Sequence, residues 1–430
     1  MKKVVIVGGG ISGLTSAVYL SEKSFDVTLV EASPKLGGRA YSLYNEEFDD
    51  YYDNGQHIMM GCYEETISLQ KKINSFDKIF VPQSLEINFI GRDNVQYDLK
   101  ATKHGYPLNL LFAILKYRAI SFKERLKIID LFLDLMCCFE EDLNELTVAD
   151  WLKCKRQSDN SIKSFWEILV VGALNTTIDK ASALVFTGIL KRIFLQGNFA
   201  SIILLPKTDL SDLFCRPSID FLQTRSGKVL LSQRITGIKT SDGFIKCLES
   251  EKGTITDFDA VIFAIPPHAL EKITIDNVPF QTPDLKYSSI LNVHLWLSSN
   301  PFAKKFYGFI GSDIHWLFNH KKHISLTSSS ADSLIPLDND KLKRHLCAEI
   351  EKYFPLFHRS MVLDSKIIKE RRATFIPDIS SIEIRKNFLN RYGNLFFAGD
   401  WIDTDLPSTI ESAVVSGKIA AEKIISSLMQ

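Results

Sequence analysis

A glycine-rich segment near the start of the chain has the spacing of a phosphate-binding turn. Residues 8–13 read Gly-Gly-Gly-Ile-Ser-Gly and follow a short apolar run that predicts a buried strand. Gly8 permits a tight turn, Gly10 lets a phosphate approach the backbone, and Gly13 lets the next helix pack closely on the strand. The N-terminus of that helix adds a partial positive charge, and Ile11 and Ser12 stand at it. The segment therefore predicts a dinucleotide site.

An acidic residue at the expected distance supports this interpretation over a glycine turn without a ligand. Glu31 lies 18 residues after Gly13, at the end of a second strand predicted over residues 25–32. A carboxylate there can accept hydrogen bonds from both ribose hydroxyls, and it disfavours a cofactor with a 2′-phosphate. We expect Ala32 and Ser33 to lie beside the same ribose.

A second glycine pair follows at once in the segment Leu-Gly-Gly-Arg that ends at Arg39. Here the sequence resembles the flavin-dependent amine oxidase and phytoene desaturase superfamily, in which an acid and a short loop precede Gly-Gly-Arg. The resemblance implies that Gly38 permits close backbone approach and that Arg39 lies near the diphosphate of the flavin. A surface ion pair is the alternative for Arg39. Ser33 stands where that superfamily often has Arg.

The segment Gly-Asn-Leu-Phe-Phe-Ala-Gly-Asp that ends at Asp400 resembles the second FAD signature of the superfamily. The resemblance implies that Asp400, next to Gly399, binds a ribitol hydroxyl. It also implies that the helix opened by Thr409 and Ile410 faces the pyrimidine edge of the flavin, where its partial positive charge stabilises the reduced ring. Ile235 matches the position whose backbone meets adenine, with a plain core residue as the alternative. Three motifs in this order predict noncovalent FAD, because no Cys follows Cys347 to hold the flavin covalently in this signature.

The segment that begins Asp53-Asn-Gly-Gln-His57 narrows the resemblance to the squalene-associated flavoproteins, the hydroxysqualene dehydroxylases of bacterial hopanoid pathways. Two positions, Asp405 and Ser412, depart from glycines expected in that family. Further segments that resemble the family lie at 165–166, 173–176, 204–206 and 398–407.

This resemblance implies a reductive reaction, in which FADH2 delivers hydride from N5 to an allylic cation formed from hydroxysqualene, with release of water and formation of squalene. Because hydroxide is a poor leaving group, the hydroxyl needs a proton. His57 is the first candidate donor, with a cofactor-bonded histidine as the alternative, and Asp403 is the second, with a loop carboxylate as its alternative. Asn175 is expected to orient the hydroxyl. Gly55, Gln56 and His57 are also expected to contact the flavin.

Other functions remain open at this point. A phytoene-type desaturase would use the same flavin oxidatively on a polyene, and a flavin amine oxidase would act on an amine. A non-catalytic flavoprotein that carries isoprenoid lipid is a further alternative. No second glycine fingerprint follows a later strand, so we expect an external electron donor.

Composition excludes several classes of protein. The 430 residues carry 51 basic and 51 acidic side chains, so nothing in the net charge favours nucleic acid as a partner. The seven cysteines form no CxxC pair, which argues against a disulfide framework and a metal site and favours a reducing, cytoplasmic location. Cys137 and Cys138 are expected to be packing residues. No apolar run could span a bilayer, but an isoprenoid substrate implies peripheral contact with the inner face of the cytoplasmic membrane. Residues 199–205 are the candidate contact, with a buried strand or helix as an even alternative.

The order of the elements predicts an α/β fold: a Rossmann-type FAD-binding domain with a parallel sheet, like glutathione reductase and amine oxidases, and an interleaved α+β substrate domain. Helical patterns fill 108–152 and most of 162–204, strands follow residue 225, and a last helix covers 409–428. We assign 1–68, 205–275 and 385–430 to the FAD-binding domain. The substrate domain, a helical insertion plus a β-sheet, is assigned 69–204 and 276–384.

Overall fold

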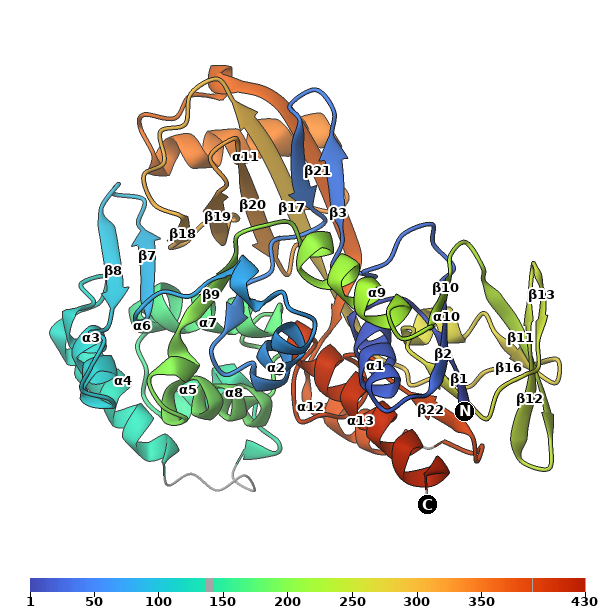
Figure 1. The fold of residues 1–430 in the computed structure, drawn as a ribbon. Coiled ribbons are helices and arrows are strands. Elements are labelled where there is room, and N and C mark those ends of the chain that lie inside the picture. The colour runs from blue at the N-terminus through green and yellow to red at the C-terminus, as the bar shows by residue number, and fades with distance from the viewer. Residues whose placement is uncertain (137–142, 389, 430) are drawn as a thin grey trace.

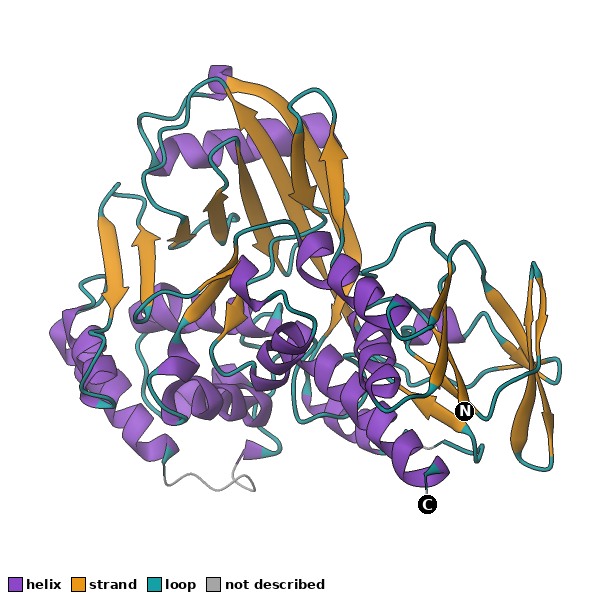
Figure 2. Ribbon diagram, viewed as in Figure 1, coloured by secondary structure: helices purple, strands orange, loops and turns teal. Residues whose placement is uncertain are grey.

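A computed structural model describes residues 1–136, 143–388 and 390–429 of the chain (Figure 1). Cys137 and Cys138 lie outside the described residues. A parallel sheet, a mostly antiparallel sheet beside it, a large sheet and a helical region make up the molecule (Figure 2). This arrangement confirms the α/β class and the Rossmann-type parallel sheet. The domain boundaries given above stay a prediction.

The parallel sheet brings together strands from three distant parts of the chain, in the order β10-β2-β1-β14-β22. Its strands are β1 (Lys3–Val7), β2 (Asp26–Val30), β10 (Lys228–Leu230), β14 (Ala260–Phe263) and β22 (Leu395–Phe397). Every pairing in it is parallel. Because the carboxyl ends of parallel strands share one edge, the turns after β1, β2 and β22 lie together there.

Both faces of the parallel sheet are covered, which explains its continuous apolar strands. Val4 and Ile6 pack into a cluster with α1 (Ile11–Glu22) and α13 (Ile410–Leu428). Val5 and Val7 point to the opposite face, toward a sheet ordered β13-β12-β11-β15-β16. Beside α1 lies α9 (Arg216–Gln223). The strands of that second sheet are β11 (Ile235–Ser241), β12 (Phe244–Ser250), β13 (Gly253–Ile255), β15 (Thr274–Ile275) and β16 (Val278–Pro279).

A seven-stranded sheet ordered β21-β17-β20-β19-β18-β7-β8 forms the upper part of Figure 1. Only its β18–β7 pair is parallel among the described strands. Helix α11 (Asn339–Tyr353) packs on one face, and the helical region contacts the other. The strands are β7 (Glu86–Ile90), β8 (Gln96–Lys100), β17 (Tyr287–Leu297), β18 (Phe306–Phe309), β19 (Trp316–Asn319), β20 (His323–Ser329) and β21 (Val362–Phe375).

The helical region is built around large aromatic side chains. Trp151, Trp166 and Phe186 are almost fully buried and meet edge to face. Edge-to-face contact is a favoured geometry for such rings. The helices are α3 (Leu108–Lys116), α4 (Phe122–Leu135), α5 (Val148–Cys154), α6 (Asp159–Ser161), α7 (Glu167–Leu174) and α8 (Ala183–Leu195).

Shorter elements connect these parts. Strands β3 (Ser42–Asn45) and β4 (Asp50–Asp53) form a hairpin. The remaining helices are α2 (Glu64–Lys72), α10 (Pro267–Leu270) and α12 (Ile379–Lys386). Short turns of helix are η1 (Phe76–Lys78), η3 (Ile162–Trp166), η4 (Phe199–Ser201), η5 (Ser211–Cys215) and η6 (Arg359–Met361).

The structure corrects the placement of the membrane contact at residues 199–205. Residues 203–206 form β9 (Ile203–Pro206), which pairs with β5 (Met59–Met60) and β6 (Ile79–Phe80). Ile202, Leu204 and Leu205 are buried, and only Phe199 is exposed. Because residues 202–205 are buried and 203–206 are paired in a sheet, they cannot contact lipid, so the buried-strand alternative is correct for them. Among the described helices, none has the length and apolar character needed to cross a bilayer.

Candidate functional site

The turn between β1 and α1 leaves open space above a helix N-terminus. Gly8 has a φ of +110°, and a Cβ at Gly13 would lie 2.0 Å from the carbonyl oxygen of Gly8. At Gly10, which caps α1, the nearest atom to a Cβ would be 3.9 Å away. No side chain caps α1, and no acidic residue lies in its first turn, at Ile11 and Ser12. Uncapped backbone N–H groups beside open space suit the diphosphate of a dinucleotide.

Glu31 is fixed at the end of β2 by two backbone N–H groups. Its carboxylate accepts a hydrogen bond of 2.6 Å from Gly9 N and one of 2.7 Å from Ser33 N. Each carboxylate oxygen keeps a further lone pair for a ribose hydroxyl. Ala32 is exposed beside it. Ile235, the buried first residue of β11, pairs with Ser250 and belongs to the apolar cluster against which Leu230 of β10 packs.

Arg39 connects the two halves of the expected flavin site. Its Nη2 donates to Asp400 Oδ1 at 2.5 Å, and its Nη1 donates to the Ala373 carbonyl at 2.6 Å. Burial alone would lower the pKa of Arg39, but the charge of Asp400 raises it, so the side chain is a permanent cation. Just before Arg39, the exposed Gly38 has a φ of +60°, which glycine adopts without strain. A fixed cation beside an uncapped helix N-terminus suits an anionic ligand.

Asp400 lies at the start of the loop that leads into α13. Its Oδ2 accepts from Ser408, and its carbonyl accepts from Ser412 Oγ at 3.2 Å. The preceding Gly399 has a φ of +148° and donates its N–H to Ser416 Oγ at 2.9 Å. Thr409 caps α13 by accepting from the backbone N–H of Ser412 at 3.2 Å. Ile410, the first residue of α13, is nearly buried.

Ser412 thus has a structural role where the family pattern led us to expect glycine. Its hydroxyl lies between the Asp400 carbonyl and Thr404 Oγ1, at 3.2 Å and 2.7 Å. The side chain is fully buried. It therefore ties the loop after Asp400 to the first turn of α13.

A cavity beside Arg39 contains polar atoms that the protein leaves without partners. His268 Nδ1 and Tyr287 Oη are buried and have no hydrogen-bond partner. Burial and the charge of Asp400 raise the pKa of Tyr287 to about 12, so its hydroxyl keeps its proton. The cavity is lined by Arg39, Pro266, Pro267, His268, Tyr287, Arg372, Phe375, Asp400 and Trp401. Orphaned polar atoms beside a cation are satisfied by water or a polar ligand, and the space here, about 10 Å³, has room for about one water molecule. The residues that fit a flavin dinucleotide are the open turn before α1, Glu31 and Arg39.

The loop from Asp53 to His57 is held firmly. Asp53 Oδ1 accepts from Ser42 Oγ at 2.8 Å and from Leu210 N at 2.9 Å. Burial raises the pKa of Asp53 to about 7. A Cβ at Gly55 would lie 2.8 Å from Asn292 Nδ2, so the glycine lets this loop approach β17.

His57 itself is half-buried and makes one hydrogen bond. Its Nδ1 donates to the Gly55 carbonyl at 2.7 Å, which leaves Nε2 available. Burial, followed by the charge of Arg39, lowers the pKa of His57, so the ring is neutral at pH 7. A neutral ring with Nδ1 protonated presents Nε2 as an acceptor. Gln56 beside it is also half-buried.

The other two candidate catalytic residues have partners within the protein. Asp403 Oδ1 lies 3.9 Å from Arg385 Nη2, whose guanidinium also donates to the carbonyls of Trp401 and Ile402. Asn175 ends α7 with a φ of +49°. Its Nδ2 donates to Thr374 Oγ1 at 2.9 Å, and its Oδ1 accepts from Ser330 N at 2.7 Å.

These hydrogen bonds connect the C-terminal end of α7 to the seven-stranded sheet. A role in orienting substrate stays a prediction for Asn175, and a role in proton transfer stays one for Asp403.

Sequence analysis missed several residues near the site. None of these residues stands in a recognisable motif: Tyr287 and Asn292 are in β17, Arg372 is in β21 and His268 is in α10. Only the Pro266-Pro267 pair, shortly after the buried strand β14, gave a local signal.

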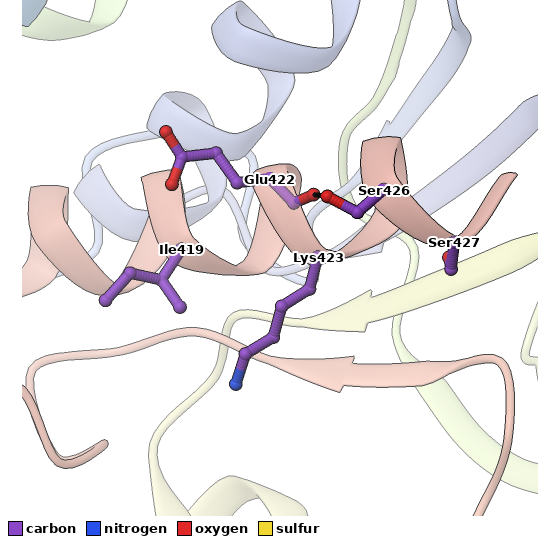
Figure 3. Close-up of a pocket in the computed structure, with 5 residues that line it drawn as sticks. All are labelled: Ile419, Glu422, Lys423, Ser426 and Ser427. Atoms are coloured by element: carbon purple, nitrogen blue, oxygen red, sulfur yellow. Dashed lines mark hydrogen bonds between the residues drawn. The ribbon is translucent and has the colours of Figure 1, made fainter. Parts of the chain in front are cut away.

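A second hollow lies on the surface of α13, away from every predicted site residue (Figure 3). Its lining residues all belong to that one helix: Ile419, Glu422, Lys423, Ser426 and Ser427. Ser426 Oγ donates to the Glu422 carbonyl within the helix at 2.9 Å. Nothing in this hollow suggests chemistry. Among the described residues, no cluster of His, Cys, Asp or Glu could hold a metal.

Comparison with solved structures shows the same fold in two oxidases. The chain superimposes on putrescine oxidase with a TM-score of 0.73 and 15% identity over 99% of both chains. It superimposes on cyclohexylamine oxidase from Brevibacterium oxydans with a TM-score of 0.71 and 15% identity over 100% of both.

Sequence comparison gives full-length relatives. The chain is 26% identical to the hydroxysqualene dehydroxylase of Zymomonas mobilis over 424 residues, which cover 98% of both chains. It is 27% identical to that of Sinorhizobium fredii over 427 residues, 99% of both. It is 23% identical to the 15-cis-phytoene desaturase of Synechococcus elongatus over 456 aligned positions, 98% of this chain and 96% of that one. These matches confirm the resemblance found in the sequence.

The family model described as flavin containing amine oxidoreductase matches residues 11–425, nearly the whole chain. The FAD predicted from the motifs agrees with this match. The chain therefore belongs to the flavin-containing amine oxidoreductases and is an FAD-dependent oxidoreductase.

Proposed function

We propose that this enzyme removes the hydroxyl group of hydroxysqualene reductively and releases squalene and water. The observation that carries the proposal is similarity over 98–99% of the chain to hydroxysqualene dehydroxylases. The resemblance of the Asp53–His57 segment to that family, read from the sequence, supports it. The reaction consumes two electrons and two protons: one C–O bond breaks, one C–H bond forms, and the oxygen leaves as water. An external donor supplies the electrons.

Four features of this chain would hold FAD without a covalent bond. The uncapped α1 N-terminus and Arg39 attract the diphosphate, Glu31 accepts the ribose hydroxyls, and Asp400 accepts a hydroxyl of the ribitol. When bound, the reduced flavin supplies the hydride that replaces the hydroxyl.

The leaving hydroxyl needs a proton, and the proposal assigns its donation to His57. The bond between its Nδ1 and the Gly55 carbonyl supports this assignment, because it leaves Nε2 available. Because burial lowers the pKa of His57, the cation that can donate from Nε2 is scarce at pH 7 and correspondingly acidic. Ile58, just before β5, and Met60, the last residue of β5, pack against the core of the helical region. This apolar surrounding suits a hydrocarbon substrate and excludes water.

The experiment that tests the proposal is anaerobic incubation of dithionite-reduced enzyme with hydroxysqualene, followed by mass spectrometry and absorbance. We expect squalene to form in step with the return of oxidised-flavin absorbance at about 450 nm in one turnover. Enzyme from which the flavin has been removed is the matched control and should form none. Unchanged hydroxysqualene with fully loaded enzyme would overturn the proposal.

A phytoene-type desaturase is the second candidate, because the similarity to phytoene desaturases also covers the chain. Such an enzyme would use the flavin in the opposite redox direction, taking hydride from its substrate. Oxidised enzyme would bleach on a polyene without oxygen, and the product would gain a conjugated double bond. Amine-dependent bleaching would instead identify an amine oxidase, and no turnover with any of these compounds would favour a lipid carrier.

A further inference from the structure

Large apolar side chains are exposed together on α3, α4 and the loop before them. Seven of the 21 exposed large apolar side chains in the described residues fall between Tyr106 and Met136. Single exposed apolar residues are ordinary on a protein surface, but a group of them marks a contact site. We call this surface the α3–α4 face; it consists of Tyr106, Leu108, Phe112, Phe122, Leu126, Leu133 and Met136.

The spacing along α4 shows that the exposure is organised. Three exposed apolar residues follow Phe122 by 4, 11 and 14 positions: Leu126, Leu133 and Met136. On a helix of 3.6 residues per turn, these spacings place all four side chains in one stripe. The core side of α4 carries a different stripe. Its buried members are Ile128, Leu131, Phe132 and Leu135.

Charged side chains occupy the third side of the helix, at Lys123, Lys127, Asp130 and Asp134. Helix α4 therefore has one apolar side for the core and a second one that the described chain leaves uncovered.

Neighbouring segments extend the α3–α4 face. Leu108 and Phe112 are one turn apart on α3, which packs against α4. Tyr106 Oη donates to the Phe194 carbonyl at 3.1 Å, and Asn109 Nδ2 donates to Asn198 Oδ1 at 2.6 Å. These bonds place the loop before α3 and the first turn of α3 beside the exposed Leu195 and Phe199. In Figure 1 α3 and α4 lie along one outer edge of the molecule.

The charge of this segment is unlike that of the whole chain. Residues 101–136, which contain the whole face, carry six basic side chains and three acidic ones, a formal charge of +3, while the full chain has a formal charge of zero. Lys103, Lys116, Arg118, Lys123 and Lys127 are exposed. Exposed apolar side chains flanked by lysines and arginines match the surface of a bilayer that contains anionic lipids, where acyl chains take the apolar groups and headgroups take the cations.

We propose that the α3–α4 face docks on the surface of an anionic lipid bilayer. The inference stands on exposure, spacing and charge, so it goes beyond the proposed function and does not depend on the identity of the substrate. It replaces the contact first expected at residues 199–205, of which only Phe199 reaches the surface. A second copy of the chain is the competing occupant of the face.

Liposome flotation of the holoenzyme tests this docking. We compare the wild type with the triple variant Phe112→Asp, Phe122→Asp and Leu133→Asp, using vesicles of phosphatidylcholine alone and vesicles with 30% phosphatidylglycerol. The matched control carries Val278→Asp, Leu356→Asp and Leu363→Asp, three equally exposed apolar positions on other parts of the chain. The flavin absorbance and melting temperature of each variant show that it is folded.

We expect the wild type and the control to float with anionic vesicles and the triple variant to lose binding by tenfold or more. Binding should fall at 1 M salt and on vesicles without anionic lipid. Lys116→Glu with Lys123→Glu should lower it at least threefold with the apolar residues intact. Equal flotation of the folded triple variant would overturn the proposal, as would a wild-type dimer in lipid-free solution that the same variant dissociates.

Discussion

Arg39 and Asp400 are 361 residues apart in sequence, and their side chains meet at 2.5 Å. Arg39 belongs to the loop after β2, and Asp400 to the loop after β22, so the ion pair joins the two flavin signatures of the chain. Asp400 is also bonded to Ser408, and its carbonyl to Ser412. A change at Arg39 therefore alters the charge that we propose attracts the diphosphate, and it also removes a bond that positions Asp400, the residue proposed to bind the ribitol.

Replacing Arg39 should weaken flavin binding without unfolding the protein. Hydrogen bonds to charged groups contribute about 1.5–3 kcal/mol each, so Arg39→Ala should raise the Kd for FAD by about tenfold or more. Arg39→Lys keeps the charge and loses the second donor, so its Kd should lie between those of Ala and wild type. Fluorescence titration of apoprotein measures the Kd, and the apoprotein melting temperature reports folding. An unchanged Kd in a folded Arg39→Ala variant would show that Arg39 is only a structural ion pair.

FAD should be noncovalent and should depend on Glu31. Denaturing the purified protein with acid should release all the yellow chromophore, and mass spectrometry should identify it as FAD. Glu31→Ala removes the acceptor for the ribose and also the partner of Gly9 N and Ser33 N, so flavin retention after gel filtration should fall by about tenfold or more. Glu22→Ala, on the outer end of α1, is the control. Chromophore left on the precipitate, or FMN in the supernatant, would refute the expectation.

Asp53 should make stability fall as the pH rises from about 4 to about 7. Burial raises the pKa of Asp53 in the folded protein from 3.8 to about 7. In that window the folded state keeps a proton that the unfolded chain loses, so the stabilisation is complete below pH 3.8 and lost by pH 7. The linked change is at most about 4 kcal/mol.

Asp53→Asn keeps the oxygen that accepts from Ser42 and Leu210 and cannot ionise. It should match wild type in urea unfolding at pH 3.8 and be more stable than wild type at pH 7.5. The control Asp98→Asn, at an exposed position, should keep the wild-type difference between the two pH values. If Asp53→Asn shows the same difference in stability between the two pH values as wild type, the pKa of Asp53 is not raised.

Local patterns predicted the dinucleotide half of the fold closely. The expected strand–helix–strand over 4–8, 11–23 and 25–32 is observed as Lys3–Val7, Ile11–Glu22 and Asp26–Val30. These elements follow from short-range rules: a buried strand reads as a continuous apolar run, and glycines mark the turn. The final helix, expected from residue 409, begins at Ile410, directly after its capping residue Thr409, which is another short-range feature.

Long-range packing accounts for what the sequence did not reveal. Residues 202–205 are apolar enough for lipid, helix or strand, and only their pairing with β5 and β6 decides between these. His268 and Tyr287 meet beside Arg39 because α10, which follows β14, lies next to the start of β17, and no single segment encodes this contact. The sequence suggested that Asn175 is a polar group for the substrate. In the structure its amide nitrogen is bonded to Thr374 and its amide oxygen to Ser330.

The pH dependence of a single turnover should identify the role of His57. If the His57 cation protonates the leaving hydroxyl, the rate of anaerobic flavin oxidation by hydroxysqualene should rise as the pH falls from 8 toward 6.5, by up to about tenfold per unit. The physical reason is that burial and Arg39 lower the pKa of His57, so the fraction of cation grows across this whole range.

His57→Asn keeps a donor to the Gly55 carbonyl and removes Nε2. It should slow the rate by about 100-fold, abolish its pH dependence and leave flavin occupancy unchanged. Asp403→Asn is the matched control, since Asp403 is held near Arg385, and it should retain the wild-type slope. If occupancy instead falls in step with rate in His57→Asn, His57 is a cofactor-pocket residue. If Asp403→Asn loses the pH dependence and His57→Asn keeps it, the carboxyl group of Asp403 is the proton donor.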